Sequence, residues 1–263
     1  MKRTACALLL LVFFSATTRS SEPISVRVLT YNIHHGEGTD GRFDLPRLAA
    51  LISAASPDLV ALQEVDQRTA RADGVDQLAE LERLTGMHGQ FGKAMDFQGG
   101  AYGVAVLTRQ PVVRAVNRAL PERADREPRT QLTVDVRMNP DGPLVHFTST
   151  HLDQGREPEH RLEQASFLND LLTTRGDMPG ILAGDMNSRP DTEVMQLLAG
   201  RWFAPFPQLS PVAPDRPRGL VDHVLARPAE DWRALETQVI DDRLASDHRP
   251  LLVVLEWSPT ATN

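Results

Sequence analysis

The sequence predicts an α/β fold in which mixed, largely antiparallel sheets are flanked by helices. Three observations support this prediction. Short β-rich segments alternate with amphipathic helical segments, several successive strands are spaced like hairpins, and no linker of biased composition divides the chain. A chain of 263 residues with 41% hydrophobic residues can bury a large core without disulfides.

The first twenty residues have the order of an export signal. Lys2 and Arg3 precede an unbroken apolar run from Ala5 to Phe14, and a small and polar stretch follows. The apolar run is too short to cross a bilayer core of about 30 Å. The sequence therefore predicts a signal peptide over residues 1–20, a single domain over residues 21–263, and a periplasmic or secreted location. A disordered tail or an uncleaved anchor is the alternative.

The mature domain is predicted to be acidic and free of cysteine. The whole chain has a net charge of −7, and removing three basic leader residues leaves 25 basic against 35 acidic residues, a net charge of −10. Because a broad grip on nucleic acid needs many lysines and arginines facing the phosphates, nucleic acid is a possible but not a favoured substrate. The one cysteine, Cys6, lies in the leader, which excludes thiol catalysis and cysteine metal sites.

The first elements of the domain are two strands and two helices. Ser25–Ile33 is β-rich and predicts a strand. Asp44 is suited to cap a helix that has Pro46 in its first turn. The short apolar run Leu59–Leu62 is typical of a buried strand, and Asp76–Thr85 predicts a second helix that a glycine ends.

The remaining elements follow the same alternation. Helices are predicted at Pro158–Thr173 and Thr192–Leu198, and Arg201–Arg218, with its five prolines, predicts a long ordered loop. In that loop Trp202, Phe203 and Phe206 are interpreted as a packing cluster rather than a binding surface. The strands predicted after residue 100 are Val104–Thr108, Val112–Ala119, Thr130–Val136, Leu144–Ser149, Ile181–Ala183, Leu220–Ala226, Thr237–Ile240 and Leu251–Glu256.

Polar residues gather at or beside the predicted strands at six places. They are Asn32 with His34 and His35, Gln63 with Glu64, His151 with Asp153, Asp185 with Asn187, Asp222 with His223, and Asp247 with His248. Strand ends that face one way can build a convergent site on a rigid frame. Carboxylate and amide oxygens without cysteine suit Mg²⁺ or Mn²⁺, and such a cation with neutral donors suits phosphoryl transfer.

Six segments resemble, in order, the motif set of the endonuclease/exonuclease/phosphatase superfamily. They are Thr30–Ile33 (TYNI), Leu62–Val65 (LQEV), Thr150–Leu152 (THL), Gly184–Asn187 (GDMN), Val221–His223 (VDH) and Ser246–Pro250 (SDHRP). The superfamily includes pancreatic deoxyribonuclease, abasic-site endonucleases, bacterial sphingomyelinases and inositol polyphosphate 5-phosphatases. The resemblance runs from about residue 25 to residue 257. It implies a four-layer sandwich of two sheets, and hydrolysis of a phosphoester by in-line attack of water without a covalent intermediate.

The resemblance also implies the residues that bind the metal and the phosphate. Glu64 would be the main ligand of Mg²⁺ or Mn²⁺, with Asn32 and Asp247 near the same ion or a second one. His151 and Asn187 would hold the phosphate oxygens.

The remaining catalytic residues are implied in the same way. Asp185 would orient or deprotonate the attacking water, and Asp222 would hold His248 in one tautomer. His248 would act as the base or as an acid that contacts the phosphate, so the choice of base between Asp185 and His248 stays open. Arg129 resembles a family arginine that reaches the phosphate, with an exposed strand-edge arginine as the alternative. Tyr102, which resembles a cleft-lining family residue, is interpreted as a packing residue.

One position departs from the nuclease members of the superfamily. Several of them carry an acidic residue two places after the asparagine that matches Asn32, and this chain has His34 there. We expect His34 to contact the phosphate of the substrate or the metal, with a structural polar residue as the alternative. The departure puts a strict two-metal scheme in doubt.

Two other functions remain open. A non-catalytic binding module on the same fold predicts the loss of at least one of the main catalytic residues, all of which are present. A zinc-dependent hydrolase would use His34, His35 and His151, although no full zinc-hydrolase spacing accompanies them. The sequence favours a monomeric hydrolase that acts on a small or lipid-linked phosphoester and has no obligate protein partner.

Overall fold

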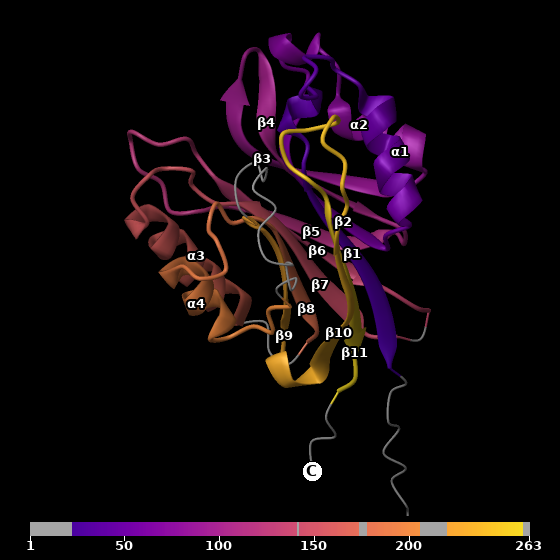
Figure 1. The fold of residues 1–263 in the computed structure, drawn as a ribbon, viewed down its shortest axis with the longest axis vertical. Coiled ribbons are helices and arrows are strands. Elements are labelled where there is room, and N and C mark those ends of the chain that lie inside the picture. Colours follow the sequence, from indigo (N-terminus) through magenta and orange to yellow (C-terminus); the bar gives the residue numbers. More distant parts are fainter. Residues whose placement is uncertain (1–22, 141, 174–177, 206–219, 260–263) are drawn as a thin grey trace, which may run out of the picture.

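The structure is a computed structural model that describes residues 23–140, 142–173, 178–205 and 220–259. These residues form two β-sheets and four α-helices in an α/β sandwich (Figure 1). The predicted fold of two mixed, largely antiparallel sheets flanked by helices is confirmed. The predicted signal peptide lies outside the described residues.

The first sheet has six strands, and only one neighbouring pair runs parallel. The parallel pair is β1 and β2, and the other neighbours are antiparallel. In spatial order the strands are β10 (Trp232–Val239), β11 (Leu251–Trp257), β1 (Ile24–Asn32), β2 (Leu59–Gln67), β4 (Gly100–Thr108) and β3 (His88–Phe97).

The second sheet has five strands and also contains one parallel pair, β7 and β8. The strands in order are β5 (Val112–Ala119), β6 (Thr130–Arg137), β7 (Leu144–His151), β8 (Gly180–Asp185) and β9 (Asp222–Arg227). Strand β2 contacts β7 and β1 contacts β8. The two parallel pairs therefore face each other across the sandwich.

The helices lie on the outer faces of the two sheets, with α1 and α2 on one side and α3 and α4 on the other (Figure 1). Asp44 caps α1 by accepting a hydrogen bond from the Arg47 amide at 2.9 Å, and Asp76 caps α2 in the same way. The helices are α1 (Leu45–Ala55), α2 (Gln77–Thr85), α3 (Glu159–Thr173) and α4 (Glu193–Ala199), with short 3-10 turns η1 (His34–Gly36), η2 (Ala70–Ala72) and η3 (Ala229–Asp231).

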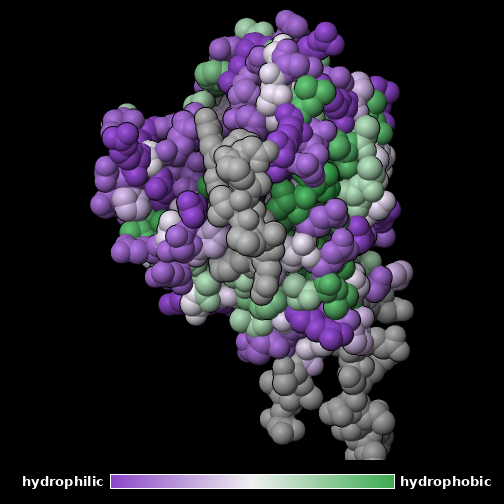
Figure 2. All heavy atoms as spheres, in the orientation of Figure 1, coloured by the Kyte–Doolittle hydropathy of each residue, from purple (hydrophilic) through white to green (hydrophobic). Residues whose placement is uncertain are grey.

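Three separate hydrophobic clusters join the four layers. Val28 and Phe147 belong to the cluster between the two sheets. Ile52 and Leu81 belong to the cluster under α1 and α2, and Leu168 belongs to the cluster under α3 and α4. Each large apolar side chain that is fully buried contributes about 1.5–3 kcal/mol relative to an exposed one. The outer face seen in Figure 2 is largely hydrophilic, with hydrophobic side chains in smaller groups.

Some elements differ from the prediction in their extent. Strand β2 continues past the apolar run to Gln67. Strand β3 has no strong apolar alternation, because most of its side chains are only partly buried, and the sequence did not single it out. Strand β9 starts at Asp222, two residues after the predicted start at Leu220.

The predicted aromatic loop is described only as far as residue 205. Trp202 is buried against α3 and α4, and its indole N–H donates to Asn169 Oδ1 at 2.9 Å. Phe203 pairs its backbone with Ala226. The packing interpretation is confirmed for Trp202, whereas Phe206 lies outside the described residues. Within the described ranges, none of the helices combines the length and the apolarity that a membrane span needs.

Candidate active site

The two parallel strand pairs bring polar side chains to one end of the sandwich. Asn32 ends β1 and pairs with Gln63 of β2, and Glu64 comes next along that strand. His151 ends β7 and pairs with Asp185, which ends β8. The carboxyl ends of neighbouring parallel strands lie at the same sheet edge, which is where α/β proteins commonly bind ligands. Each sheet therefore supplies part of one site.

The antiparallel neighbours of these strands complete the site. Asp222 begins β9 and pairs with Asp185. His248 lies just before β11, whose first residue pairs with Thr30 near the end of β1. The hydroxyl of Ser246 donates to the Asn32 carbonyl oxygen at 2.7 Å, and this bond holds the segment before β11 against β1.

Asp185 is the centre of the polar network. Its Oδ2 accepts a hydrogen bond from Asn32 Nδ2 at 3.1 Å and lies 3.4 Å from His151 Nε2 and 3.7 Å from His248 Nε2. Its Oδ1 accepts from the backbone amide of Asn187 at 2.8 Å. The predicted residues Asn32, His151, Asp185, Asn187 and His248 are thus brought together.

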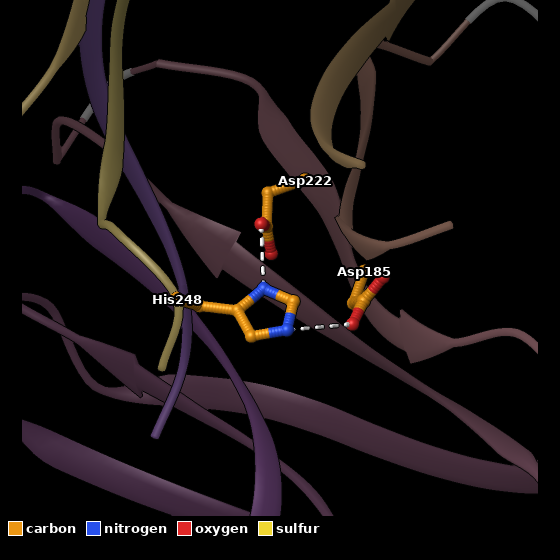
Figure 3. Close-up of side chains that lie close together, drawn as sticks. All are labelled: Asp185, Asp222 and His248. Atoms are coloured by element: carbon orange, nitrogen blue, oxygen red, sulfur yellow. Dashed lines mark hydrogen bonds and ion pairs between the residues drawn. The ribbon is translucent and has the colours of Figure 1, made fainter. Parts of the chain in front are cut away.

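His248 lies between two carboxylates (Figure 3). Its Nδ1 is 2.9 Å from Asp222 Oδ2, and its Nε2 faces Asp185. Because a carboxylate oxygen faces each ring nitrogen, the arrangement suits a protonated imidazole that donates from both sides. The resemblance to the superfamily implied this contact between His248 and Asp222.

The pKa values of this group follow from burial and from the neighbouring charges. Burial, helped by the charge of Asp222, raises the pKa of Asp185 from 3.8 to about 7. Burial lowers the pKa of His248, but Asp222, Asp185 and Asp247 outweigh it and raise the pKa from 6.5 to about 10. In the protein without metal, His248 is therefore a cation at neutral pH, and Asp185 is close to its titration midpoint.

Arg129 determines the tautomer of His151. Burial, and then the charges of Arg129 and His248, lower the pKa of His151 well below its usual range, so the ring is neutral. Arg129 Nη1 lies 2.7 Å from His151 Nδ1, and an arginine can only donate. The ring proton is therefore on Nε2, which faces Asp185. Arg129 is 3% exposed, so the alternative of an exposed strand-edge arginine is wrong.

Three of the candidate site residues, His34 (φ +46°), Glu64 and Asn187, have a left-handed backbone. Glu64 (φ +58°) lies where the pairing of β2 with β4 shifts register, and Asn187 (φ +45°) follows β8. Such conformations cost about 1–3 kcal/mol in residues other than glycine and are concentrated at functional sites. The bulge in β2 turns the Glu64 carboxylate so that Oε1 accepts from Asn32 Nδ2 at 2.9 Å.

Glu64 and Asn32 lie together and carry the kinds of oxygen atom that a hard divalent cation prefers. Glu64 is partly exposed and is joined through Asn32 to the buried Asp185. Asp247 is partly buried and lines a pocket together with His248. Carboxylate and amide oxygens without sulfur are the ligands that Mg²⁺ and Mn²⁺ prefer.

A second group of candidate ligands lies deeper. Asp185, Asp222 and His248 have ligand atoms within 4.8 Å of one another, and they are the one such group of three among the described residues. His248 is protonated at neutral pH and bonded to Asp222, so it offers no lone pair to a cation. This group therefore fits a proton-holding unit better than a metal site. His34, His35 and His151 do not form such a group, which counts against the zinc alternative.

His34 acts on the site through its backbone. Its amide donates to Asn32 Oδ1 at 3.0 Å, while its ring Nδ1 lies 3.0 Å from the Glu37 carbonyl oxygen. His35 contacts the Glu37 carboxylate at 3.2 Å. The structure thus places His34 beside Asn32, and its contact with a substrate stays a prediction.

Three other residues beside the strand ends have structural contacts. Gln63 is buried and lies 3.4 Å from the Thr30 hydroxyl. Asp153 accepts from the Gly155 amide at 2.8 Å, and His223 donates from Nε2 to the Ser188 carbonyl oxygen at 2.8 Å. These bonds hold the loops and strands that carry the site residues.

A pocket of about 120 Å³ adjoins Glu64 and Arg129. Arg71, Phe97 and Gln154, which also line it, were not predicted from the sequence. Arg71 lies in the short turn η2 and Phe97 ends the hairpin strand β3, so neither follows an apolar strand in the pattern that revealed the other residues.

The comparisons with known proteins identify the family of the chain. A model of the Endonuclease/Exonuclease/phosphatase family matches residues 29–248. A comparison with curated proteins gives no match.

Solved structures share the fold over most of the chain. An endonuclease/exonuclease/phosphatase from Beutenbergia cavernae is 28% identical with a TM-score of 0.71, covering 90% of this chain and 73% of that chain. A mannosyl-6-phosphatase from Bacteroides thetaiotaomicron is 18% identical with a TM-score of 0.68, covering 88% and 99%. ANGEL2, a 2',3'-cyclic phosphatase, is 13% identical with a TM-score of 0.71, covering 91% and 98%.

Proposed function

The chain belongs to the endonuclease/exonuclease/phosphatase family, and from this premise we propose that it is a divalent-metal-dependent hydrolase of phosphoester bonds. The observation that carries the proposal is the network centred on Asp185, in which a carboxylate of raised pKa lies beside a neutral histidine and a cationic one. A binding module that had lost catalysis would have no need to keep these groups together.

The neutral side chains of the second sheet are suited to hold the phosphate. His151 Nε2–H and Asn187 Nδ2, both donors, lie 3.0 Å apart, and Asn187 Nδ2 donates one of its two protons to the Leu152 carbonyl oxygen at 2.9 Å. Two neighbouring donors can bind one anionic oxygen between them and stabilise the charge that grows on it during phosphoryl transfer. Arg129 keeps His151 in the tautomer that donates.

The proton transfers are assigned to Asp185 and His248. We infer that Asp185 accepts the proton of the attacking water, because its pKa near 7 suits a base at neutral pH. His248, with carboxylate oxygens facing both ring nitrogens, is held as a cation and would stabilise or protonate the leaving oxygen. Asp222 keeps the His248 ring in place. The sequence alone left open whether Asp185 or His248 is the base.

A hard cation bound by Glu64, with Asn32 and Asp247, would polarise the phosphate and offset its negative charge. We propose Mg²⁺ or Mn²⁺ in this place. The support is the set of oxygen donors and the absence of cysteine after the leader.

The location and the partners are proposed from the sequence. The leader pattern supports export to the periplasm or the outside of the cell. The acidic balance of the domain supports a small or lipid-linked phosphoester over bulk nucleic acid. A monomer without an obligate protein partner is part of the same proposal.

A substrate panel tests the proposed function. The mature protein is assayed with Mg²⁺ or Mn²⁺ on plasmid DNA, bis-p-nitrophenyl phosphate, sphingomyelin and inositol phosphates, with and without a chelator. We expect hydrolysis of at least one phosphoester and its loss on chelation. Inactivity on the whole panel, or turnover that survives chelation, would contradict the proposal.

A further inference from the structure

The pocket beside the catalytic network has a composition that restricts what it can bind. It is lined by Glu64, Arg71, Phe97, Tyr102, Arg129 and Gln154, among others. Glu64 and Arg129 also belong to the catalytic network, through Asn32 and His151 respectively. A group that fills this pocket would therefore be attached directly to the reacting phosphate.

Both arginines of the pocket already have a carboxylate partner. Arg71 donates from Nε and Nη2 to the buried Asp66 at 2.6 and 2.9 Å. Arg129 lies 3.0 Å from Glu127 Oε1. The cation proposed at Glu64 would be occupied by the reacting phosphate, so the side chains of the pocket offer no unmatched positive charge for a second phosphate. A polyanionic substrate is therefore disfavoured in this pocket.

The pocket offers both hydrogen-bond donors and hydrogen-bond acceptors. Arg129 Nε is buried and has no hydrogen-bond partner among the described residues. The carboxylates of Glu64 and Glu127 accept, and the side-chain amide of Gln154 does both. A hydroxyl group can both donate and accept a hydrogen bond, so a ligand with several neighbouring hydroxyl groups would match this lining.

The aromatic rings of the pocket are partly covered by an arginine side chain. The Arg71 guanidinium lies 4.7 Å from the Phe97 ring centroid and 5.4 Å from that of Tyr102. Tyr102 is only 5% exposed. Nucleobases are bound by stacking on a free aromatic face, and here the guanidinium lies over one face of each ring, which disfavours a stacked base.

We propose that this pocket binds the hydroxyl-rich part of a small phosphate monoester, such as the ring of a sugar phosphate or a cyclitol phosphate. The proposal rests on the proposed function and names the substrate class of the same site. The cavity volume of about 120 Å³ is close to the roughly 150 Å³ of an engineered cavity that binds one benzene molecule, which suits one ring rather than a polymer.

The kinetic test compares substrates that share the phosphate and differ in the rest. The mature protein with Mg²⁺ is assayed on a hexose 6-phosphate, an inositol monophosphate, p-nitrophenyl phosphate, AMP and a short DNA. We expect kcat/KM to be at least about 10-fold higher for the polyol phosphates than for AMP, the size of an effect of one or two hydrogen bonds. An equal or higher value for AMP or DNA would overturn the inference and leave the phosphoesterase proposal standing.

Two variants locate the preference in the pocket. Gln154→Ala and Phe97→Ala remove a polar and an apolar part of the lining without leaving a buried charge unpaired. In each, the ratio of kcat/KM for hexose 6-phosphate over p-nitrophenyl phosphate should fall about 5- to 10-fold. The matched control is Leu235→Ala, which is 50% exposed on β10 at the opposite edge of the sheet, and it should keep the wild-type ratio. An unchanged ratio in both pocket variants would overturn the inference.

A binding measurement separates the two proposals. If no substrate is turned over, the proposed function fails, and calorimetric titration of His248→Ala with hexose 6-phosphate and with AMP decides the inference alone. Tighter binding of the hexose phosphate, weakened when Gln154→Ala is added, would uphold the pocket as a polyol site. Equal binding of the two ligands, or tighter binding of AMP, would overturn it.

Discussion

At the scale of single residues, the site depends on how each charge is matched by its neighbours. Asp185 is almost fully buried yet contacts Asn32, His151, His248 and the Asn187 amide. A buried carboxylate without such donors would be neutral at pH 7. The donors keep its pKa near 7 and so let it exchange a proton at neutral pH.

Removing either proton-transferring group should abolish turnover. Asp185→Asn keeps the shape of the side chain but cannot accept a proton, and His248→Ala removes the cation. We expect kcat to fall about 10³-fold or more in each variant. The control is His88→Ala, an exposed histidine at the start of β3 and far from the site, which should keep wild-type kcat. Wild-type rates in either site variant would rule out these assignments.

Asp222 should determine the protonation of His248. In metal-free protein, burial alone would lower the pKa of His248, and Asp222 is the main group that raises it to about 10. The Asp222–His248 pair therefore stabilises the fold fully below about pH 6.5, and this contribution is lost as the pH rises through about 10.

An NMR titration of the His248 ring checks this expectation. Asp222→Asn should shift the titration of the ring to a pH at least about one unit lower, because a hydrogen bond to a charged partner is lost. The free energy of unfolding of the variant should also lose the decrease toward about pH 10 that the Asp222–His248 pair causes in the wild type. An unchanged titration curve would show that Asp222 has no such effect.

At the scale of elements, two neighbouring strands must approach closely to place the site. A Cβ atom on Gly184 would lie 2.0 Å from the Thr150 carbonyl oxygen, so only glycine allows β8 to pair with β7 at this point. The next residue on each strand, His151 and Asp185, belongs to the catalytic network. The pairing therefore controls the distance between these two side chains.

Gly184→Ala should weaken both stability and activity. Forcing the strands apart should lower the free energy of unfolding by about 1–3 kcal/mol, as overpacking does. A displacement of the strand ends by about 1 Å can reduce kcat/KM about 10²-fold. Denaturant unfolding and steady-state assays measure the two effects. Gly142→Ala is the control, because an added Cβ there meets nothing closer than 3.4 Å.

The elements differ in how well the sequence predicts them. Apolar runs such as Leu59–Leu62 predict the central strands, because a strand that is buried on both faces needs a continuous apolar run. The bulge at Glu64 leaves no such pattern, since it depends on how β2 pairs with β4. Strand β3 lies at a sheet edge with partly buried side chains, so its sequence lacks a clear alternation.

The candidate site was largely predictable, and the pocket beside it was not. Asp185, His151 and Asp222 are local features, each at the end or start of an apolar strand. Arg71 and Gln154 reach the pocket from a short turn and a loop, and only the tertiary structure brings them together. The residues at a strand end can be predicted from one sequence segment. The residues that line a cavity come from several segments, and their meeting depends on the tertiary structure.

At the scale of the whole molecule, the site concentrates negative charge at one end of an acidic chain. Glu64, Asp185, Asp222 and Asp247 belong to this end, and the net charge of the full chain is −7. Such an assembly of carboxylates is self-repelling, and a bound cation would relieve the repulsion.

Divalent metal should therefore stabilise the fold. A cation that binds only the folded state at a hundred times its Kd adds about 2.7 kcal/mol to the free energy of unfolding. We expect Tm to rise with Mg²⁺ or Mn²⁺ and to fall on chelation, and Glu64→Gln to need a higher metal concentration for the same rise. Thermal unfolding at several metal concentrations measures this. A Tm independent of metal would contradict the proposed cation site.

The facing parallel pairs have a consequence for how the enzyme assembles. One half-site, Asn32 and Glu64, is carried by the first sheet, and the other, His151 and Asp185, by the second. A folding intermediate in which only one sheet has formed would have secondary structure but no catalytic activity. The time at which activity first appears during refolding would therefore report when the two sheets pack together.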